Sequence, residues 1–253
     1  MTNHLILSIF SFLIVVSSLV GQEDHPLYNI NDRILSAQDE SFRDGVDKIE
    51  ALLTPINAYE ETGNGHWKAY WTAYTKFQQS NFWAYNSYHK DEDIAKELTG
   101  EAIKILSDIK DKNAEDYALL GYIKGYSLQW ISFLKMPKES GKAGKWVAKA
   151  VEMAPDNPRS NMVFGNNDFY TPKMFGGGKA VESSMQKAIS LYKEAVPNPY
   201  MPSWGMPKAY QMLTRHYLKN DMIAQAKATI TEGLQRYPEH KTLQSLEDKV
   251  LEQ

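Results

Sequence analysis

The stretch FYTPKMFGGGKA, residues 169–180, places three glycines and a lysine just ahead of an expected helix. A nucleotide-binding P-loop needs G-x-x-x-x-G-K-[ST] after a β-strand, because backbone N–H groups must cradle phosphate and a hydroxyl must reach Mg²⁺. Counting back from Gly178 and Lys179, Lys173 holds the first glycine position and Ala180 holds the hydroxyl position. The residues before it read as a helix. The stretch therefore fits neither a P-loop nor the G-x-G-x-x-G of a dinucleotide site.

A weaker functional interpretation of the same glycines stays open. Free N–H groups at Gly176 to Gly178 would favour an anion at a helix start, with Lys179 nearby. The alternative is structural, since glycine allows the positive φ that a long turn between helices requires. We favour the structural interpretation.

The other polar residues show no catalytic or metal-binding pattern. No histidine belongs to H-E-x-x-H or to an i,i+4 pair, and no serine stands in G-x-S-x-G. His89 and the acidic residues 91–93 have the ligand types of a metal site, but a favourable helix N-terminus explains them better. The sequence predicts a non-enzymatic protein without a metal or another cofactor.

Aromatic residues offer a candidate binding surface. The stripe between residues 67 and 77 falls on one face of an expected helix, where a core position is favoured over a ligand groove. Trp204 stands in a proline-rich turn, and we expect it either to pack against Phe175 or to stand at the mouth of a groove. The candidate groove or partner-binding residues are Tyr170, Phe175, Lys179, Trp204, Trp67 and Trp71.

Composition and charge exclude several classes of function. The chain of 253 residues has a formal net charge of −3, which does not suggest the basic face that nucleic-acid binding needs. It contains no cysteine, so disulfides, thiol catalysis, cysteine-zinc sites and lipid attachment to a cysteine are excluded.

The beginning of the chain has the layout of a secretory signal peptide. An apolar run from Leu5 to Val16 is followed by small residues, although no Lys or Arg precedes it. The run is shorter than the roughly 18 to 20 apolar residues that span a bilayer. We expect cleavage between Ser18 and Gly21, which gives an exported, periplasmic protein that is not a lipoprotein. The predicted organisation is a signal peptide at 1–21, an irregular N-terminal segment at 22–38 and a helical repeat domain at 39–253.

Beyond residue 38 the apolar residues recur at helical spacing, and β-type alternation is nearly absent. Gly121 and Gly125 share a helix face, which indicates the close approach of another helix. The residues MPKESG, 136–141, are expected to lengthen a turn. Asp91 is expected to cap a helix whose buried face is Ile94, Leu98, Ala102, Ile105 and Ile109.

The last part of the chain matches the tetratricopeptide (TPR) pattern of about 34 residues. Small residues in this pattern stand where two helices cross, large ones fill the gap to the next pair, and a proline ends the second helix. Looser matches surround residues 143–155 and the helix that begins at Asn157. The well-matched positions are Tyr210, Leu213, Thr214, Tyr217, Ala226, Ile230, Gly233 and Pro238.

These motifs carry a resemblance to known proteins. The chain resembles exported tetratricopeptide-like proteins of Bacteroidetes-type bacteria, in which NPR opens a helix, YTP…FGGG joins it to the next, and P.WG precedes the last repeat. Here these are residues 157–159, 170–178 and 202–205. More distantly, the chain is similar to the helical T component associated with periplasmic TRAP transporters. The resemblance implies a helical-repeat fold, and it brings no catalytic residues.

The sequence therefore predicts an all-α protein whose TPR-like hairpins form a short α-solenoid. We expect a scaffold or adaptor that binds an unidentified protein or peptide on its concave surface, because stacked repeats present such a surface. The alternative is a periplasmic protein that binds a small molecule in a pocket lined by Tyr and Trp. An enzyme is the least favoured class, and neither nucleic acid nor a membrane span in the mature chain is expected.

Overall fold

The structure is a computed structural model that describes residues 25–61 and 66–253. The predicted signal peptide lies outside the described residues. Within them the chain is helical and contains no β-strand. The helices are α2 (Ile30–Asp44), α3 (Asp47–Ala51), α4 (Leu53–Ala58), α5 (Trp67–Tyr85), α6 (Glu92–Asp108), α7 (Ala114–Ser127), η1 (Leu128–Trp130), α8 (Met136–Met153), α9 (Pro158–Tyr170), η2 (Lys173–Phe175), α10 (Val181–Glu194), α11 (Met206–Lys219), α12 (Ile223–Arg236) and α13 (Lys241–Leu251).

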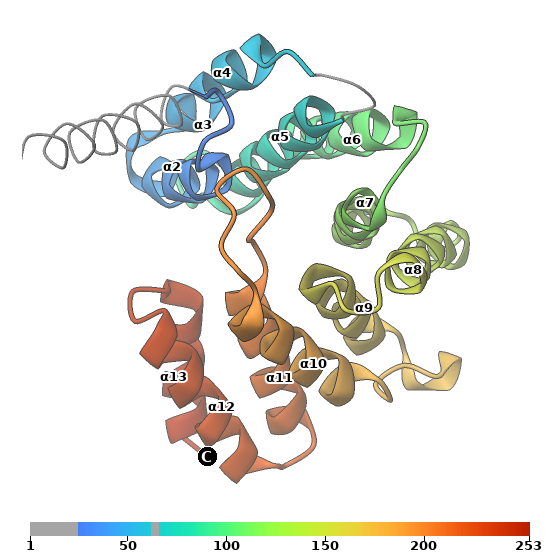
Figure 1. Ribbon diagram of the computed structural model, residues 1–253. Coiled ribbons are helices and arrows are strands. Elements are labelled where there is room, and N and C mark those ends of the chain that lie inside the picture. Colours follow the sequence, from blue (N-terminus) through green and yellow to red (C-terminus); the bar gives the residue numbers. More distant parts are fainter. Residues whose placement is uncertain (1–24, 62–65) are drawn as a thin grey trace, which may run out of the picture.

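The helices pack as consecutive hairpins, which confirms the predicted all-α solenoid. The pairs α5–α6, α7–α8, α9–α10 and α11–α12 make the most extensive contacts between helices. They follow one another along an arc that begins at α2 and ends at α13 (Figure 1). Helix α13 packs on the last pair, so it covers an end that another repeat would otherwise cover.

The pairs are arranged in two layers. The first helices touch one another along the arc, since α5 contacts α7, α7 contacts α9, and α9 contacts α11. The second helices pack on their own partner and on the first helix of the next pair. Because the elements on the inside of a curve approach one another most closely, α5, α7, α9 and α11 form an inner layer, and α6, α8, α10 and α12 an outer layer.

The TPR-pattern residues of the last repeat lie where the pattern requires them. Tyr210, Thr214 and Tyr217 are buried on α11, and Ala226 and Ile230 are buried on α12. A Cβ added to Gly233 would lie 3.1 Å from Tyr210, so the small residue allows the two helices to cross closely. Leu213 is also buried, and Pro238 follows the end of α12.

Two local predictions are confirmed, and a third holds only in part. The Asp91 side chain accepts the backbone N–H groups of residues 93 and 94, and the Asn157 side chain accepts that of residue 160. A Cβ on Gly121 would lie 2.6 Å from Val147, so a helix does approach there. Gly125 has open space around it instead.

The irregular segment expected at 22–38 is wrong from residue 30 onward, and so is the turn expected at 136–141, whereas residues 22–24 lie outside the described residues. Helix α2 begins at Ile30, because Ile30, Ile34 and Ala37 recur at helical spacing and are buried in the core. The residues MPKESG begin α8 rather than lengthen a turn. Pro137 is compatible with this helix because it stands in the first turn, where a backbone N–H has no intrahelical acceptor.

The buried face of α6 is rotated from the predicted one. The helix buries Ala95, Thr99, Ala102 and Leu106, whereas Ile94 and Ile105 are half-buried. The hydroxyls of Ser80 and Thr99 lie 2.7 Å apart, and the Ser80 hydroxyl donates to the Ala95 carbonyl. Small side chains and these hydrogen bonds allow α5 and α6 to pack closely, which hydrophobicity alone did not predict.

Candidate functional site

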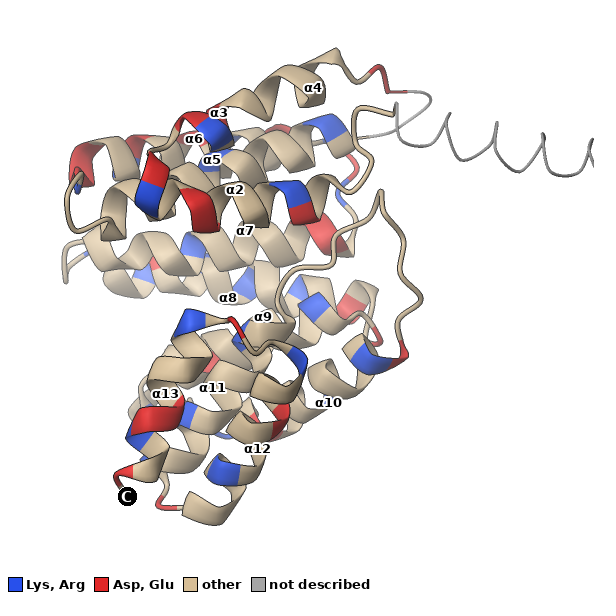
Figure 2. Cartoon of the chain, turned by 90° about the vertical axis from the view of Figure 1, so that its left-hand side faces the viewer, with Lys and Arg blue, Asp and Glu red and all other residues tan. Residues whose placement is uncertain are grey.

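A long segment of the chain crosses the inner layer. Residues 195–205, which we call the strap, connect α10 to α11. They leave these helices and extend to the N-terminal helices at the opposite end of the arc (Figures 1 and 2). Asn198 begins a turn within it, and Gly205 ends it with a φ of 109°, a left-handed value that suits glycine.

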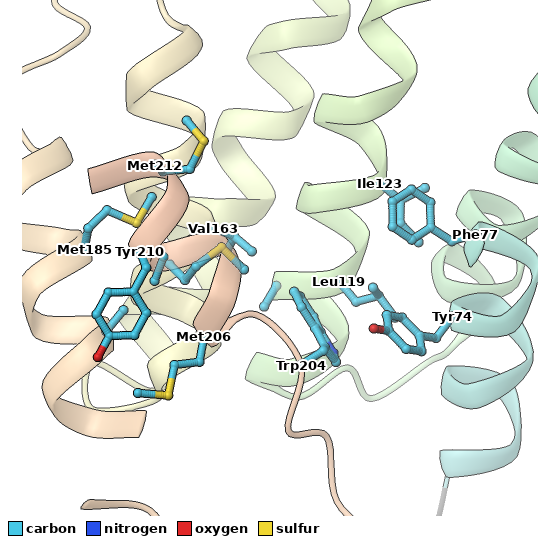
Figure 3. Close-up of a cluster of buried hydrophobic side chains, with 14 of the residues drawn as sticks. Tyr74, Phe77, Leu119, Ile123, Val163, Met185, Trp204, Met206, Tyr210 and Met212 are labelled. Carbon is cyan, nitrogen blue, oxygen red and sulfur yellow. The ribbon is translucent and has the colours of Figure 1, made fainter. Parts of the chain in front are cut away.

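Trp204 anchors the strap on the inner layer. Its ring stacks between those of Tyr74 of α5 and Tyr122 of α7, at centroid distances of 5.8 and 5.6 Å. Its indole N–H donates to the Tyr70 hydroxyl at 2.8 Å, and the side chain is 4% exposed. Figure 3 shows Trp204 within the core, beside Leu119 and Tyr74. Burial raises the pKa of Tyr70 well above its usual value, so the hydroxyl keeps its proton. The expectations of a Phe175 contact or a place at a groove mouth are therefore wrong for Trp204.

Further contacts fix the second half of the strap. The Ser203 N–H donates to the Asn31 side chain of α2 at 3.2 Å, and the Tyr192 hydroxyl donates to the Trp204 carbonyl at 2.7 Å. The Tyr200 ring meets the His25 ring edge-on at 4.8 Å. The strap thus joins the C-terminal repeats to the first helices of the arc.

A buried ion pair lies beside the strap. The Arg159 guanidinium of α9 binds the Glu115 carboxylate of α7 through two N–H groups, at 2.6 and 2.5 Å. The Asn157 amide donates to the same carboxylate at 2.5 Å. Both charged side chains are nearly inaccessible to solvent. The pair therefore links two inner helices, and each partner depends on the other because an unpaired buried charge is costly.

A second buried carboxylate adjoins this pair. Asp116 accepts the Asn113 backbone N–H in the capping box of α7, and one of its oxygens lies 3.0 Å from His66 Nε2. Burial raises the pKa of Asp116 to about 6, although the Asn113 N–H and His66 oppose this. We therefore expect the first turn of α7 to respond to pH.

The opposite ends of the inner helices are not covered by the strap. Tyr85, Tyr126 and Tyr170 stand in the last turns of α5, α7 and α9, and Tyr85 and Tyr170 are exposed. The Tyr85 and Tyr126 rings lie 6.2 Å apart, and an Arg215 N–H of α11 lies 3.5 Å from the Tyr170 hydroxyl. With Lys219, which lies over the Phe169 ring, these residues form what we call the open end.

Two polar groups near the open end have no partner among the described residues. The Tyr126 hydroxyl and the Asn166 side-chain oxygen are both buried without a hydrogen bond. At the other end of the inner layer, the half-buried Lys208 amine lies in the first turn of α11. Burial and the Arg215 charge lower its pKa to about 8. These groups leave hydrogen-bonding capacity on the inner layer for another molecule.

The glycine-rich elbow between α9 and α10 is a structural turn, as favoured from the sequence. The N–H groups of Gly176, Gly177 and Gly178 all donate to carbonyls of residues 168–173. The Asp168 carboxylate accepts the Ala180 N–H at 2.7 Å. An internal carboxylate therefore already holds this helix start, and the three glycines have no free N–H group for an anion.

The other candidate residues divide between core and surface. Trp71 is fully buried and Trp67 is half-buried, with its ring edge-on to Tyr70 at 5.4 Å. Phe175 and Lys179 are exposed on the elbow. Sequence reasoning missed Arg215 and Lys208, which stand seven residues apart on one face of α11. Their spacing was the available signal.

Two surface hollows have measurable volume. One, of about 370 Å³, lies between the start of α5 and the end of α6 and is lined by residues that include His66, Ile105 and Asp111. The other, of about 260 Å³, lies on the outer side between α10 and α12, with Lys193 and Tyr210 in its lining. Neither is lined by tryptophan. They do not match the aromatic pocket expected for a small-molecule-binding protein.

Two other features concern metals and membranes. Within the described ranges, no group of three or more His, Cys, Asp or Glu side chains is placed to hold a metal ion. No helix in the described part of the chain is both long enough and apolar enough to cross a membrane.

Comparison with known proteins supports the fold. Neither a protein-family model nor a curated protein matches the chain. It is similar to a thermophilic TPR protein of Thermus thermophilus, with 15% identity and a TM-score of 0.59 over 85% of this chain and 100% of that one. It is also similar to the HusA haemophore of Porphyromonas gingivalis, with 20% identity and a TM-score of 0.54 over 75% of this chain and 92% of that one. At these identities the comparison shows a TPR-like fold.

Proposed function

We propose that this protein is a non-enzymatic scaffold or adaptor that binds a segment of another protein at the open end of its inner layer. The observation that carries the proposal is the strap. Its docking supports the idea that the inner helices bind an extended segment through aromatic stacking and hydrogen bonds, as they do with Trp204. A partner segment uses the same chemistry at the end that the strap leaves free.

The composition of the open end defines the partner. The tyrosines supply apolar surface with hydroxyl groups at one side, which is common in protein interfaces. Arg215 and Lys219 supply positive charge, and neither forms a salt bridge with a described residue. The partner segment accordingly carries carboxylate groups next to an aromatic or aliphatic side chain.

Affinity capture from the protein's own cell envelope tests this proposal, with bound proteins and small molecules identified by mass spectrometry. We expect a protein that is captured by the wild type and lost with Arg215→Glu or Tyr170→Ala. The matched control is Lys227→Glu, on the exposed side of the outer helix α12. Equal capture by all the variants, or recovery of a stoichiometric metabolite without a protein, would contradict the proposal.

A second candidate function is the binding of a small aromatic molecule. Burial raises the pKa of Tyr122, and Tyr170 and Tyr85 raise it further. The tyrosines of the open end are therefore close enough to Tyr122 to act on it together. The similarity to a haemophore suggests hemin as the first probe. A change in the hemin absorption spectrum that saturates at one equivalent, and that Tyr170→Ala and Tyr85→Ala abolish, would favour this candidate over the first.

Export is part of the same proposal. We propose that residues 1–21 direct the chain to the periplasm and are then removed. N-terminal sequencing of the protein from its native envelope tests this, and a chain that still begins at Met1 would contradict it.

A further inference from the structure

Large apolar side chains are exposed on three turns of the chain. Tyr88 lies between α5 and α6, Phe133 and Leu134 lie between α7 and α8, and Met174 and Phe175 lie between α9 and α10. Each of them is between 72% and 90% exposed. Scattered single apolar residues on a surface are ordinary, but these recur at the same point of three consecutive hairpins.

The hairpin architecture places the three turns on one edge of the molecule. Each of these turns, residues 86–91, 128–135 and 171–180, joins a first helix to a second helix. Consecutive helices of the arc pack against each other. Since every short connection reverses the chain, all first helices run in one direction and end at the same edge. We call these three turns, residues 86–91, 128–135 and 171–180, the turn edge.

Lysines accompany the apolar residues on the turn edge. Lys90 follows Tyr88, Lys135 follows Leu134, and Lys173 and Lys179 flank Phe175. Lys90 pairs with Glu92 at 3.1 Å, whereas the other three have no salt bridge with a described residue. The whole chain has a formal net charge of −3, and acidic and basic residues alternate along α2 (Figure 2). The turn edge therefore has the opposite charge to the protein as a whole.

Hydrogen bonds hold the turns in defined shapes. The N–H groups of Tyr88 and His89 donate to the Asn86 side chain, and the Lys135 N–H donates to the Ser132 carbonyl. On the elbow, Gly176 and Gly178 adopt φ values of 88° and 85°, which suit glycine. The glycines thus let the elbow present Met174 and Phe175 as a fixed tip.

We infer that the turn edge docks the protein on an anionic lipid bilayer. Separate protruding apolar side chains fit a fluid interface, which accepts each one individually, whereas a protein partner would need a matching pocket for every tip. Lysines beside them place their ammonium groups at the lipid headgroups while their stems cover apolar surface. The unpaired positive charge selects anionic headgroups, so the protein lies on the bilayer without spanning it.

Vesicle flotation tests the inference, with residues 22–253 as the protein. All helices that the structure describes begin at Ile30 or later, so this chain keeps them and lacks the apolar run of residues 5–16. The two lipid probes are vesicles of phosphatidylcholine alone and vesicles that also contain phosphatidylglycerol. We expect binding to the second kind and little to the first.

Two sets of variants separate the contributions. Phe133→Ser with Leu134→Ser should weaken binding more than about tenfold, since it removes two inserted side chains. Lys135→Glu and Lys173→Glu should each weaken it about fivefold or more. The matched controls are Val196→Ser with Leu251→Ser, which are exposed apolar residues outside the turn edge, and Lys227→Glu; all should bind as the wild type does.

Three outcomes would overturn the inference. These are no binding to either vesicle, equal binding to both kinds, and equal loss in the control variants. Circular dichroism and thermal unfolding check that every variant is folded, which is expected because the altered side chains are exposed. The turn edge adjoins the open end, and Arg215→Glu distinguishes the two proposals, since it should reduce partner capture and leave vesicle binding within about twofold.

Discussion

The two ends of the inner helices are built from equivalent positions but serve different purposes. The first turns of α5, α7 and α9 carry Tyr70, Glu115 and Arg159, and all three are buried and paired beneath the strap. The last turns carry Tyr85, Tyr126 and Tyr170, and no segment of the described chain covers them as the strap covers the other end. The strap therefore covers one end of the inner helices, whereas the other end is exposed.

This difference shows how a repeat protein can use one part of its own binding surface for stability. Lys208 occupies the corresponding place in the first turn of α11, the next inner helix after α9. It has no carboxylate partner among the described residues. An ion pair thus joins the first turns of α7 and α9, and in the described part of the chain none joins those of α9 and α11. The predictions below test whether the covered end determines stability and the open end does not.

The largest effect is expected for Trp204→Ala. The substitution removes a buried indole and leaves the Tyr70 hydroxyl without its donor, so we expect a loss of about 3 to 5 kcal/mol in the free energy of unfolding. Urea unfolding followed by circular dichroism measures it. Trp204→Phe keeps the stacking and should cost less, about 1 to 3 kcal/mol. A loss below about 1 kcal/mol for Trp204→Ala would show that the strap does not stabilise the solenoid.

Breaking the buried ion pair should be nearly as costly. Arg159→Met leaves the Glu115 carboxylate buried and unpaired, and we expect a loss of about 3 to 5 kcal/mol in the free energy of unfolding. Combining it with Glu115→Leu removes the unpaired charge, so the double variant should be more stable than the single one. A double variant that is less stable than Arg159→Met would contradict this, because it would show that the unpaired Glu115 charge is not what destabilises the single variant.

The effect of Asp116→Asn should depend on pH. Burial raises the pKa of the folded-state carboxyl above its ordinary value, to about 6. Protonation therefore stabilises the folded state below the unfolded-state pKa near 4, and this contribution is lost as the pH rises through about 6. The asparagine variant does not titrate, so the stability of the wild type relative to it should fall by up to about 1.4 kcal/mol per pH unit in this window.

Urea unfolding at several pH values between about 4 and 7 measures this difference. His66, Glu115 and Lys112 also act on Asp116 and remain in both proteins. The control is Asp248→Asn on the exposed side of α13. A constant difference between wild type and Asp116→Asn across the window would contradict the prediction.

The smallest effect on stability is expected at the open end. Tyr170→Ala removes an exposed side chain, so the free energy of unfolding should change by less than about 0.5 kcal/mol. The same urea experiment measures it beside Trp204→Ala. A loss comparable to that of Trp204→Ala would mean that both ends of the inner helices are structural, and the comparison would fail.

Sequence reasoning predicted the elements whose signals are local. The helix caps at Asp91 and Asn157 depend on a side chain and the backbone two or three residues later, and both are present. The last repeat could be predicted because its large and small residues recur at the spacing of two packed helices. The buried face of α6 could not, because hydrophobicity favoured Ile94 and Ile105 over the small residues that pack on α5.

The amino-acid sequence by itself determined that the chain is helical, that its helices form TPR-like pairs, and that the glycine-rich elbow is no nucleotide site. Periodicity and glycine spacing carry this information over a few residues. Only the tertiary structure decided that Trp204, about 130 residues away from Tyr74, stacks against it and closes one end of the inner layer. Such contacts depend on the curvature accumulated over several repeats. For the same reason, only the fold shows that Tyr88, Phe133 and Phe175 share one edge.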